Sequence, residues 1–290
     1  MPRDIDPRAI ERDVERPDVS RGGRLPEDAR VPVRVNPRDV FMRAVDLPRG
    51  SARERIEWRG RTYDLRGSEV RMLTTVGAFR TVPAHDLRDH GGREARARSG
   101  DLYALRRAGL VRTTTAVLHG RRTTLVALTR HGHQLLEGHR ARDAPQTFYR
   151  GPARARELTH DSQLYRAYLR AADRLAGRGA SVRRVILDAE LKREYQQFLQ
   201  EGNRGRPDSD GRPTQDRDAV EAWAKSHELP FFDDRVHFPD VRVEYETVDG
   251  GREIEDLEVI TPHYRGAHAG DKVRAGWAPF DPRVAEEFLR

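Results

Sequence analysis

The sequence predicts an α+β protein built from two unlike parts. Residues 67–140 contain segments with apolar side chains at helical spacing, and two runs of β-branched residues that suit a hairpin follow them. Residues 158–290 alternate helical and strand-like segments, which indicates an α/β domain with a small mixed sheet. Residues 141–157 are polar, with prolines at 145 and 152, and we predict a linker there.

Composition excludes several classes of protein. The chain has 290 residues and no cysteine, so disulfides and thiolate metal sites are excluded. It has no apolar run approaching the roughly 20 residues that cross a bilayer, and its first residues lack the apolar core of a signal peptide. We therefore expect a soluble, cytoplasmic protein without a membrane partner.

The first 50 residues are rich in proline, arginine and aspartate and have no sustained periodicity. We predict a disordered or extended basic arm, because repeated prolines block helix continuation. The first domain, residues 51–140, then opens with a strand pair, Ile56–Trp58 and Thr62–Leu65, turning at Arg59-Gly60-Arg61.

Three helices and a hairpin are expected next. Ser68 is positioned to cap a helix that runs to Phe79, a short helix is expected over Thr81–Leu87, and a third helix over Arg93–Ala108, ending at Gly109. Residues 110–129 read as two strands around a basic tip. A final helix follows Thr129, and its apolar residues are Leu135 and Leu136.

Positive charge is concentrated in this first domain. Residues 67–140 carry a net charge of +7, equal to that of the whole chain, whereas residues 231–290 carry −6. Only Lys192, Lys225 and Lys272 among the 54 basic residues are lysines, a bias typical of a GC-rich genome, so placement is better evidence than residue type. Such local basic density is expected of a surface that replaces counterions along phosphates.

The order and spacing of three fragments resemble the winged-helix module of MarR- and PadR-like bacterial DNA-binding proteins. The fragments are Leu102–Val111, Gly120–Arg122 and Leu128–Leu136. The resemblance implies an N-terminal winged helix-turn-helix that binds double-stranded DNA. Leu102, Leu105 and Leu110 would seat the recognition helix, whose outer face would enter the major groove.

The expected DNA-binding residues follow from that arrangement. The recognition helix and its start would contribute Arg93, Arg96, Arg98, Ser99, Tyr103, Arg106 and Arg107, and the hairpin tip alongside would contribute Arg121 and Arg122. Which arginines read bases and which neutralise phosphate stays open. A winged helix used for protein contacts is an alternative, and a homodimer is a further expectation.

The second half is expected to begin with a long amphipathic helix. The predicted elements are a helix over Leu158–Leu175, a strand over Val182–Leu187, helices over Leu191–Leu199 and Ala219–His227, strands over Val241–Glu246 and Ile254–Ile260 around Asp249-Gly250-Gly251, and two short closing helical pieces.

Pro239-Asp240 and the acidic run Glu255–Ile260 resemble the core of PD-(D/E)xK nucleases, in which carboxylates on adjacent strands hold Mg²⁺ and a lysine orients water. The resemblance implies a catalytic set of Asp240, Asp256, Glu258 and Lys272, with Asp240 and Glu258 as metal ligands. The lysine position holds Ile260 or Glu258 instead, and Lys272 lies further on. We therefore expect a restriction-endonuclease-like fold without activity and no cofactor, with Mg²⁺ reserved for the nuclease alternative.

The overall layout is similar to the replication-relaxation family of plasmid and mobile-element proteins. The similarity rests on the winged-helix pattern, Thr159-His160-Asp161, the proline-aspartate pair, Leu257-Glu258 and Lys272. It implies a DNA-binding accessory or regulatory protein in replication, mobilisation or transcription control. The alternatives are a Mg²⁺-dependent nuclease, and an interaction protein whose acidic end recruits a basic partner such as a relaxase or replication initiator.

Five histidines of the second half lack the spacing of a metal site. They are His160, His227, His237, His263 and His268. We expect them to cap, pack and form hydrogen bonds, with His160 and Asp161 at the start of the long helix.

Overall fold

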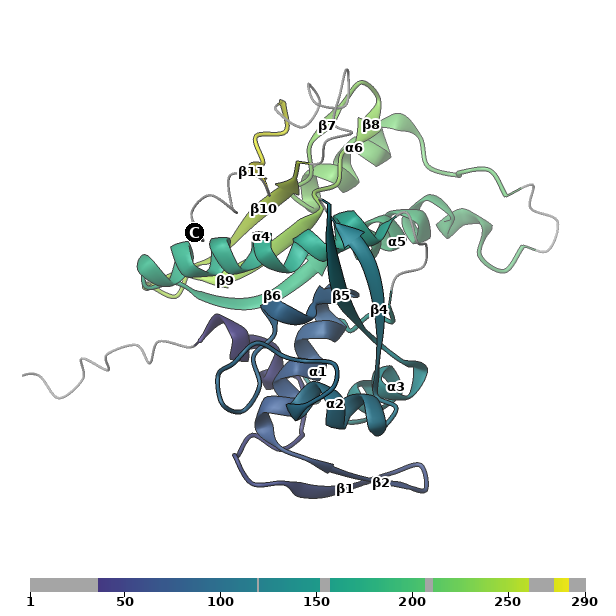
Figure 1. Cartoon of the computed structure of the whole chain (residues 1–290). Helices are drawn as coiled ribbons and strands as arrows, with labels where there is room; N and C mark the ends of the chain where they lie inside the picture. Colours follow the sequence, from purple (N-terminus) through teal and green to yellow (C-terminus); the bar gives the residue numbers. More distant parts are fainter. Residues whose placement is uncertain (1–35, 119, 152–156, 207–210, 261–273, 282–290) are drawn as a thin grey trace, which may run out of the picture. The chain divides into compact units, whose positions relative to one another are not determined.

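A computed structural model describes residues 36–118, 120–151, 157–206, 211–260 and 274–281. The protein is α+β, as the sequence predicts (Figure 1). All of the described residues belong to one compact unit, 34–290. The two halves predicted from sequence are therefore parts of one body.

The first half combines helices with two antiparallel hairpins. Its elements are the 3₁₀ helix η1 (Pro37–Ala44), β1 (Glu54–Trp58), β2 (Arg61–Leu65), α1 (Gly67–Phe79), β3 (Val82–Pro83), the 3₁₀ helix η2 (Ala84–Asp86), α2 (Gly100–Arg107), β4 (Val111–Leu118), β5 (Arg121–Leu128) and α3 (Arg130–Gly138). Strands β1 and β2 pair as predicted. A second sheet has the order β3-β5-β4, so the long β4–β5 hairpin is joined by the short strand that follows α1.

Two predicted helix boundaries in this half are wrong. Helix α1 begins at Gly67, with Arg66 rather than Ser68 at the N-cap, because the Glu69 carboxylate accepts the Arg66 backbone N–H at 3.1 Å. The short helix predicted over Thr81–Leu87 is confined to the 3₁₀ helix at residues 84–86, since Val82 and Pro83 pair with β5 as a strand.

The arm and linker predictions are wrong for the parts that the structure describes. Residues 37–44 form η1, because the ring of Phe41 is buried against Phe79. In the segment predicted as a linker, Gln146 and Phe148 are buried. The side-chain amide of Gln146 accepts the Val185 N–H at 2.9 Å and donates to the Val185 carbonyl at 3.0 Å. These residues therefore belong to the packed structure.

The second half is a mixed sheet with helices, as predicted. Its elements are α4 (Leu158–Gly177), β6 (Ser181–Leu187), α5 (Asp188–Leu199), the 3₁₀ helix η4 (Glu201–Asn203), α6 (Arg217–Ser226), β7 (Phe231–Phe232), β8 (Arg235–Val236), β9 (Val241–Glu246), β10 (Arg252–Val259) and β11 (Ala278–Phe280). The main sheet has the order β11-β10-β9-β6, and only β11 runs parallel to its neighbour.

Strand β11 was not predicted from the sequence, which indicated only two short helical pieces without bounds at this end of the chain. Ala278, Pro279 and Phe280 pair with the end of β10 as strand β11, and Phe280 is buried in the main core. The remainder of that prediction lies outside the described residues.

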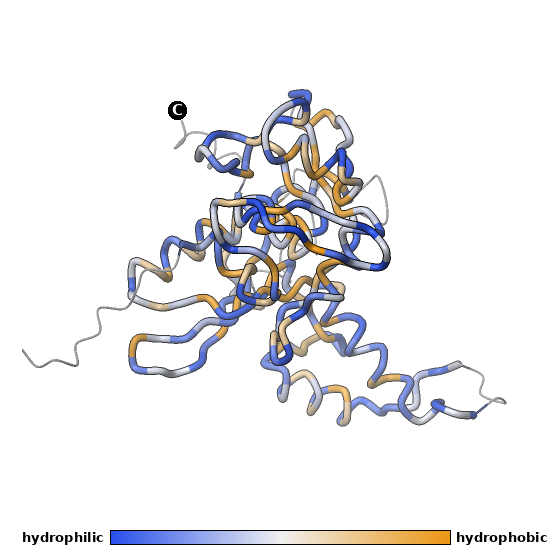
Figure 2. The backbone as a smooth tube through the Cα atoms, turned by 90° about the horizontal axis from the view of Figure 1, so that it is seen from below, coloured by the Kyte–Doolittle hydropathy of each residue, from blue (hydrophilic) through white to orange (hydrophobic). Residues whose placement is uncertain are grey.

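One hydrophobic cluster contains side chains from both halves, from Val40 to Phe280. In Figure 2 the orange hydrophobic stretches concentrate toward the centre, and the outlying loops are mostly blue. At the junction, the ring of Phe79 lies 5.4 Å from Phe41, 5.1 Å from Tyr165 and 5.2 Å from Tyr168. The halves thus share a core through η1, α1 and α4.

No helix among the described residues combines the length and the apolar character needed to cross a bilayer.

We expect the substitution Phe79→Ala to lower the free energy of unfolding by about 3–5 kcal/mol, because it empties a fully buried aromatic site. Chemical denaturation followed by circular dichroism measures this change. The control is Val117→Thr, at a side chain 67% exposed on β4, which should change stability by less than about 0.5 kcal/mol. Equal stabilities for the two variants would contradict a shared core.

Candidate functional site

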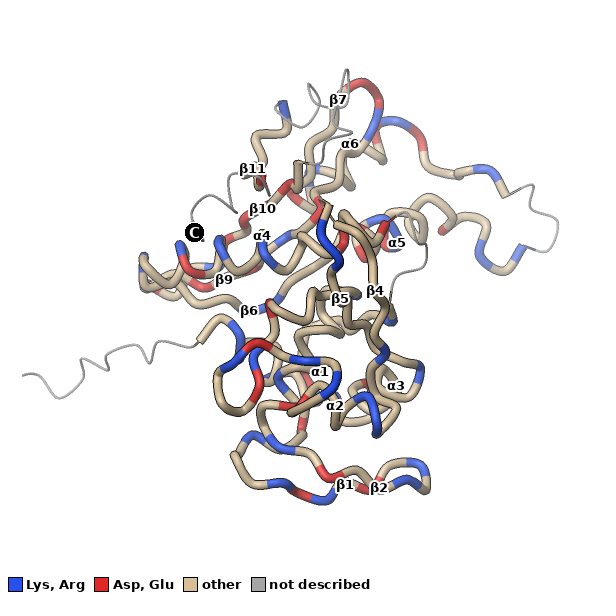
Figure 3. The backbone as a smooth tube through the Cα atoms, viewed as in Figure 1, with Lys and Arg blue, Asp and Glu red and all other residues tan. Residues whose placement is uncertain are grey.

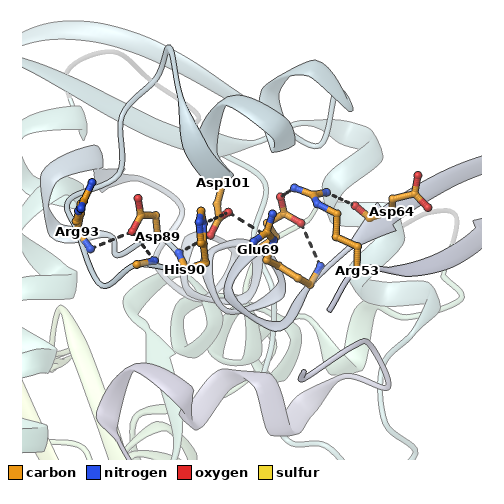
Figure 4. A network of polar contacts seen from close by, with 9 residues as sticks. Arg53, Asp64, Glu69, Asp89, His90, Arg93 and Asp101 are labelled. Atoms are coloured by element: carbon orange, nitrogen blue, oxygen red, sulfur yellow. Dashed lines mark hydrogen bonds and ion pairs between the residues drawn. The ribbon is translucent and has the colours of Figure 1, made fainter. Parts of the chain in front are cut away.

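Helix α2 is attached to the body of the first half by a network of polar contacts around its first turn (Figure 4). The buried carboxylate of Asp101 accepts the His90 backbone N–H at 2.7 Å and lies 2.9 Å from His90 Nδ1. Arg66 Nε, at the start of α1, is 3.8 Å from the same carboxylate. These contacts fix the start of α2 against α1 and the preceding loop.

A second buried carboxylate, Glu69, anchors the β1–β2 hairpin to α1 in the same network. Arg53 donates to Glu69 and also to the carbonyl oxygen of Asp64, at 2.6 Å. Burial is the largest influence on Glu69 and raises the pKa of its carboxyl, against the opposing effects of the Arg66 N–H and the Arg53 charge. The ion pair with Arg53 thus offsets part of the cost of burying the carboxylate.

The helix predicted over Arg93–Ala108 is wrong in its first seven residues, because α2 begins only at Gly100. Asp89 explains the difference: its carboxylate accepts the backbone N–H groups of Gly91 and Arg93, both at 2.9 Å, and so stabilises a turn. Gly100 has a φ of +66°, which reverses the chain before the helix. Arg93, Arg96 and Arg98 therefore lie on a loop, and Ser99 occupies the N-cap position.

Helix α2 has one buried and one exposed side, as predicted. Leu102 and Leu105 are fully buried, whereas the side chain of Tyr103 is 40% exposed. The guanidinium of Arg107 lies 5.9 Å from the ring of Tyr103, and Arg106 donates to the Ala97 carbonyl at 2.6 Å. Five exposed arginines in this area form no ion pair within the described residues: Arg93, Arg96, Arg98, Arg106 and Arg107. We call these arginines and Tyr103 the α2 surface.

The start of α3 docks at the junction between α2 and β4. Thr129 donates its backbone N–H to the Leu110 carbonyl at 3.0 Å and its hydroxyl to the Gly109 carbonyl at 2.6 Å. A Cβ at Gly132 would lie 2.0 Å from the Leu110 oxygen, so glycine permits this close approach. Arg130 and His131, the first residues of α3, are exposed next to this junction, and they were not among the predicted DNA-binding residues.

Arg121 and Arg122 are exposed near the tip of the β4–β5 hairpin. Leu118 pairs with Arg121, and Leu118 is the last residue of the strand that starts at Val111, just after α2. At about 3.3 Å per residue, the tip is about 23 Å along the strand from its start. Figure 1 shows the hairpin leading away from α2 and α3. The tip and the α2 surface are therefore two separate basic areas, and the prediction that the tip lies alongside the recognition helix is wrong.

Asp240 lies where the sequence analysis placed it, beside strand β10. Its Oδ2 accepts the Val259 backbone N–H at 2.9 Å and lies 3.1 Å from His160 Nε2. Val259 follows Glu258, whose side chain is buried. The structure thus brings Asp240 and the Glu258 segment together at one end of the sheet.

Asp256 is not brought into that group. Its carboxylate accepts two hydrogen bonds, at 2.8 and 2.9 Å, from the guanidinium of Arg242, its cross-strand partner. Arg242 is itself buried and also donates to the carbonyl oxygens of His227 and Glu228. A bidentate pair of this kind is a structural arrangement that leaves the Asp256 carboxylate engaged.

The fourth residue of the predicted catalytic set, Lys272, lies outside the described residues. Within the described part of the chain, no three His, Asp or Glu side chains are grouped so that they could hold a metal ion.

His160 connects Asp240 to a series of alternating charges. Its Nδ1 lies 3.5 Å from Asp161 Oδ1, and the other oxygen of Asp161 is 4.0 Å from Arg80 Nη1. The N-cap of α4 is Glu157, so the prediction that His160 and Asp161 cap this helix is wrong for His160, which instead bridges two carboxylates.

Arg80 continues the series to α5. Its Nη2 is 3.7 Å from Asp188 Oδ1, and Asp188 Oδ2 is 2.7 Å from Lys192 Nζ. Arg80 also stacks its guanidinium over the Tyr149 ring, 5.4 Å from the centroid. It directly follows α1 and has a φ of +61°, a conformation uncommon for arginine. One side chain thus joins the end of α1 to the starts of α4 and α5.

Burial is the largest single influence on the pKa of His160 and lowers it. Hydrogen bonds to Asp161 and Asp240, together with the charges of both carboxylates, outweigh that effect and raise the pKa to about 10. His160 is therefore a cation at neutral pH.

Two other histidines confirm the expectation of packing and hydrogen bonding. His227 Nδ1 lies 2.8 Å from the Trp223 carbonyl oxygen, and the two rings stack at 3.9 Å. His237 Nε2 lies 3.3 Å from the Phe232 carbonyl oxygen. His263 and His268 lie outside the described residues.

In comparisons with known proteins, no family model, curated protein or solved structure matches the chain.

The elevated pKa of His160 gives a test through pH. A group whose pKa is raised by folding contributes its full stabilisation below its unfolded pKa of about 6.5, and this contribution is lost as the pH rises toward 10. The stability difference between the wild type and His160→Asn should therefore shrink by more than about 1 kcal/mol between pH 6 and pH 10. Urea denaturation across this range measures it, and a difference independent of pH would show that His160 is not held as a cation.

Proposed function

We propose that residues 51–140 form a winged-helix module that binds double-stranded DNA through the α2 surface. The observation that carries the proposal is the combination of two buried leucines with a set of exposed arginines, which form no ion pair within the described residues, on one short helix and the loop before it. The connection of α1, β3, η2 and α2 to a hairpin, within a sheet of order β3-β5-β4, supports the same assignment.

The charge of the α2 surface suits a polyphosphate partner. Five exposed arginines lie near two acids that are not buried, Glu94 and the half-buried Asp89, whereas Asp101 is buried. Lys and Arg segments surround α2 and α3 in Figure 3, whereas Asp and Glu segments gather along β10. Arginines that form no ion pair within the described residues keep their charge available to replace counterions on DNA. Tyr103 supplies an exposed ring for sugar or base contact.

The β4–β5 tip offers a second contact area in this proposal. Because Arg121 and Arg122 are at the far end of the strands from α2, they would contact backbone phosphates away from the segment that α2 reads. Arg130 and His131, beside the junction of α2 and β4, extend the α2 surface toward the flanking phosphates.

The sequence resemblance to replication-relaxation proteins suggests the setting: an accessory or regulatory protein of a plasmid or integrative element. The acidic strands β9 and β10 would then be a surface for a basic protein partner, as expected for recruitment of a relaxase or replication initiator. Two acids of these strands, Glu244 and Glu255, are engaged by Arg184 and Arg174, so a partner would compete with these two arginines there.

The double variant Arg106→Ala/Arg107→Ala should bind DNA more weakly and with a salt slope reduced by about 2, because each lost phosphate contact removes about 0.9 from the slope. Fluorescence anisotropy with a labelled 30-bp duplex between 50 and 200 mM salt measures both quantities. The matched control is Arg183→Ala/Arg252→Ala, which removes two exposed arginines from the second half.

Arg121→Ala/Arg122→Ala in the same assay separates the two basic areas. We expect a smaller loss of affinity that is similar for different duplex sequences, since the hairpin tip would touch phosphates alone. If the control pair lowers affinity as much as the α2 pair, the binding is unspecific attraction to a basic chain and the α2 surface is not the site.

A nuclease is the second candidate, favoured by the closeness of Asp240 to the Glu258 segment. We expect supercoiled plasmid to remain uncut in Mg²⁺ or Mn²⁺, because Arg242 engages Asp256 and isoleucine stands two residues after Glu258. Gel electrophoresis of the plasmid tests this. Nicking by the wild type that disappears in Asp240→Ala but persists in Asp256→Asn would replace the accessory function with an enzymatic one.

A further inference from the structure

A cavity of about 640 Å³ lies away from the α2 surface, between the starts of α4 and α5 and the segment 149–151. Its volume is within the range of sites that hold small organic ligands. Its lining includes the side chains of Arg80, Arg150, Asp161, Lys192 and Arg193. None of the DNA-binding residues considered above lines this cavity.

Two helices begin at the cavity, and their first turns supply backbone N–H donors. Helix α4 has 20 residues and α5 has 12, and neither has a side-chain hydrogen bond at its N-cap. The first N–H groups of a helix have no partner within the helix, and the helix dipole favours an anion at that end. One of these groups, the Asp188 N–H, is directed to the Asp240 carbonyl at 3.3 Å.

The lining of the cavity carries more positive than negative charge. Its cations are Arg80, Arg150, Lys192, Arg193 and the protonated His160, and its acids are Glu157, Asp161 and Asp188. Asp188 is already neutralised by Arg80 and Lys192. Arg150 and Arg193 are exposed and take part in no ion pair within the ranges that the structure describes. These two guanidinium groups can bind an incoming anion.

One buried oxygen of the lining accepts no hydrogen bond within the described residues. The side chain of Asp161 is only 4% exposed, and its Oδ2 accepts no hydrogen bond from the described residues. Its nearest cation, Arg80 Nη1, is 4.0 Å away, which is too far for a hydrogen bond. A buried carboxylate oxygen without a donor is costly. A ligand with an O–H or N–H group would remove that cost.

We propose that this cavity binds a nucleotide. The phosphate group would lie against Arg150, Arg193 and the first turn of α5, where both guanidinium donors and backbone N–H groups favour it. A sugar hydroxyl or a base amino group would donate to Asp161 Oδ2. The same chemistry can come from a free mononucleotide or from the 5′-phosphorylated end of a DNA strand. The proposal does not depend on DNA binding by the α2 surface.

Isothermal titration calorimetry of the full chain with AMP and with adenosine tests the proposal. We expect AMP to bind at least tenfold more tightly than adenosine, since only AMP carries the phosphate. The double variant Arg150→Ala/Arg193→Ala should lose at least tenfold in AMP affinity, and both substitutions are at exposed positions that the fold does not need. Arg121→Ala/Arg122→Ala is the matched control and should bind AMP as the wild type does.

A second variant, Asp161→Asn, examines the donor contact. It should weaken the binding of AMP and of adenosine by the same factor, because it alters the contact that both ligands share, and circular dichroism checks that it folds. Equal affinities for AMP and adenosine in the wild type, or an unchanged AMP affinity in the Arg150/Arg193 variant, would overturn the proposal.

Competition between AMP and oligonucleotides distinguishes a free nucleotide from a strand end as the ligand. The competition is measured in the Arg106→Ala/Arg107→Ala variant, which lacks two arginines of the α2 surface. Displacement of AMP by a 5′-phosphorylated oligonucleotide, and not by its 5′-hydroxyl form, supports the cavity as a site for a strand end. When AMP binds and neither oligonucleotide displaces it, the cavity is supported as a site for free nucleotide.

Discussion

The packing of Phe79 between η1 and α4 is the constraint on which the arrangement of this protein depends. Phe79 ends α1, and its ring contacts Phe41, Tyr165 and Tyr168 within one buried cluster. Because α1 is thereby fixed against α4, the next residue, Arg80, is held at a positive φ with its side chain directed at Asp161 and Asp188. The apolar contacts thus position a set of charges that burial alone would disfavour.

That shared core also relates the two proposed sites. Helix α2 is held by Asp101 and His90 against the front of α1, whereas the cavity begins at the other end of α1, where Arg80 follows Phe79. Helix α1 therefore supports α2, and with it the α2 surface, near its start. At its end, α1 contributes to the cavity. A rigid element between two sites provides a physical connection, although coupling between them requires that the element has two arrangements.

Local patterns predicted the regular elements well. The bounds of β9 are those expected from the alternation of Val241–Glu246, and the helix from Leu158 was expected from its apolar spacing. The errors arise where a distant or irregular contact decides the structure. The start of α2 depends on the Asp89 turn, and η1 depends on aromatic rings that lie far away in the sequence.

The candidate sites were predictable to a similar extent. Spacing identified the exposed face of α2 and the closeness of Asp240 to β10, because both follow from one helix or one hairpin. Sequence analysis could not show that Arg242 engages Asp256 or that Arg80 reaches α4 and α5. These pairs form between residues of different helices and strands, so the periodicity of a single segment of the sequence does not reveal them. The only signal for Arg242 was its position on the strand beside the acidic run.

The amide of Gln146 has a consequence for the behaviour of the protein at high concentration. Strand β6 is at one edge of the main sheet, and an open edge is a template for pairing with another chain. Gln146 occupies both the N–H and the carbonyl of Val185 with a single side chain, as a neighbouring strand would. A segment without regular secondary structure therefore blocks the addition of a foreign strand at Val185, in the edge strand β6.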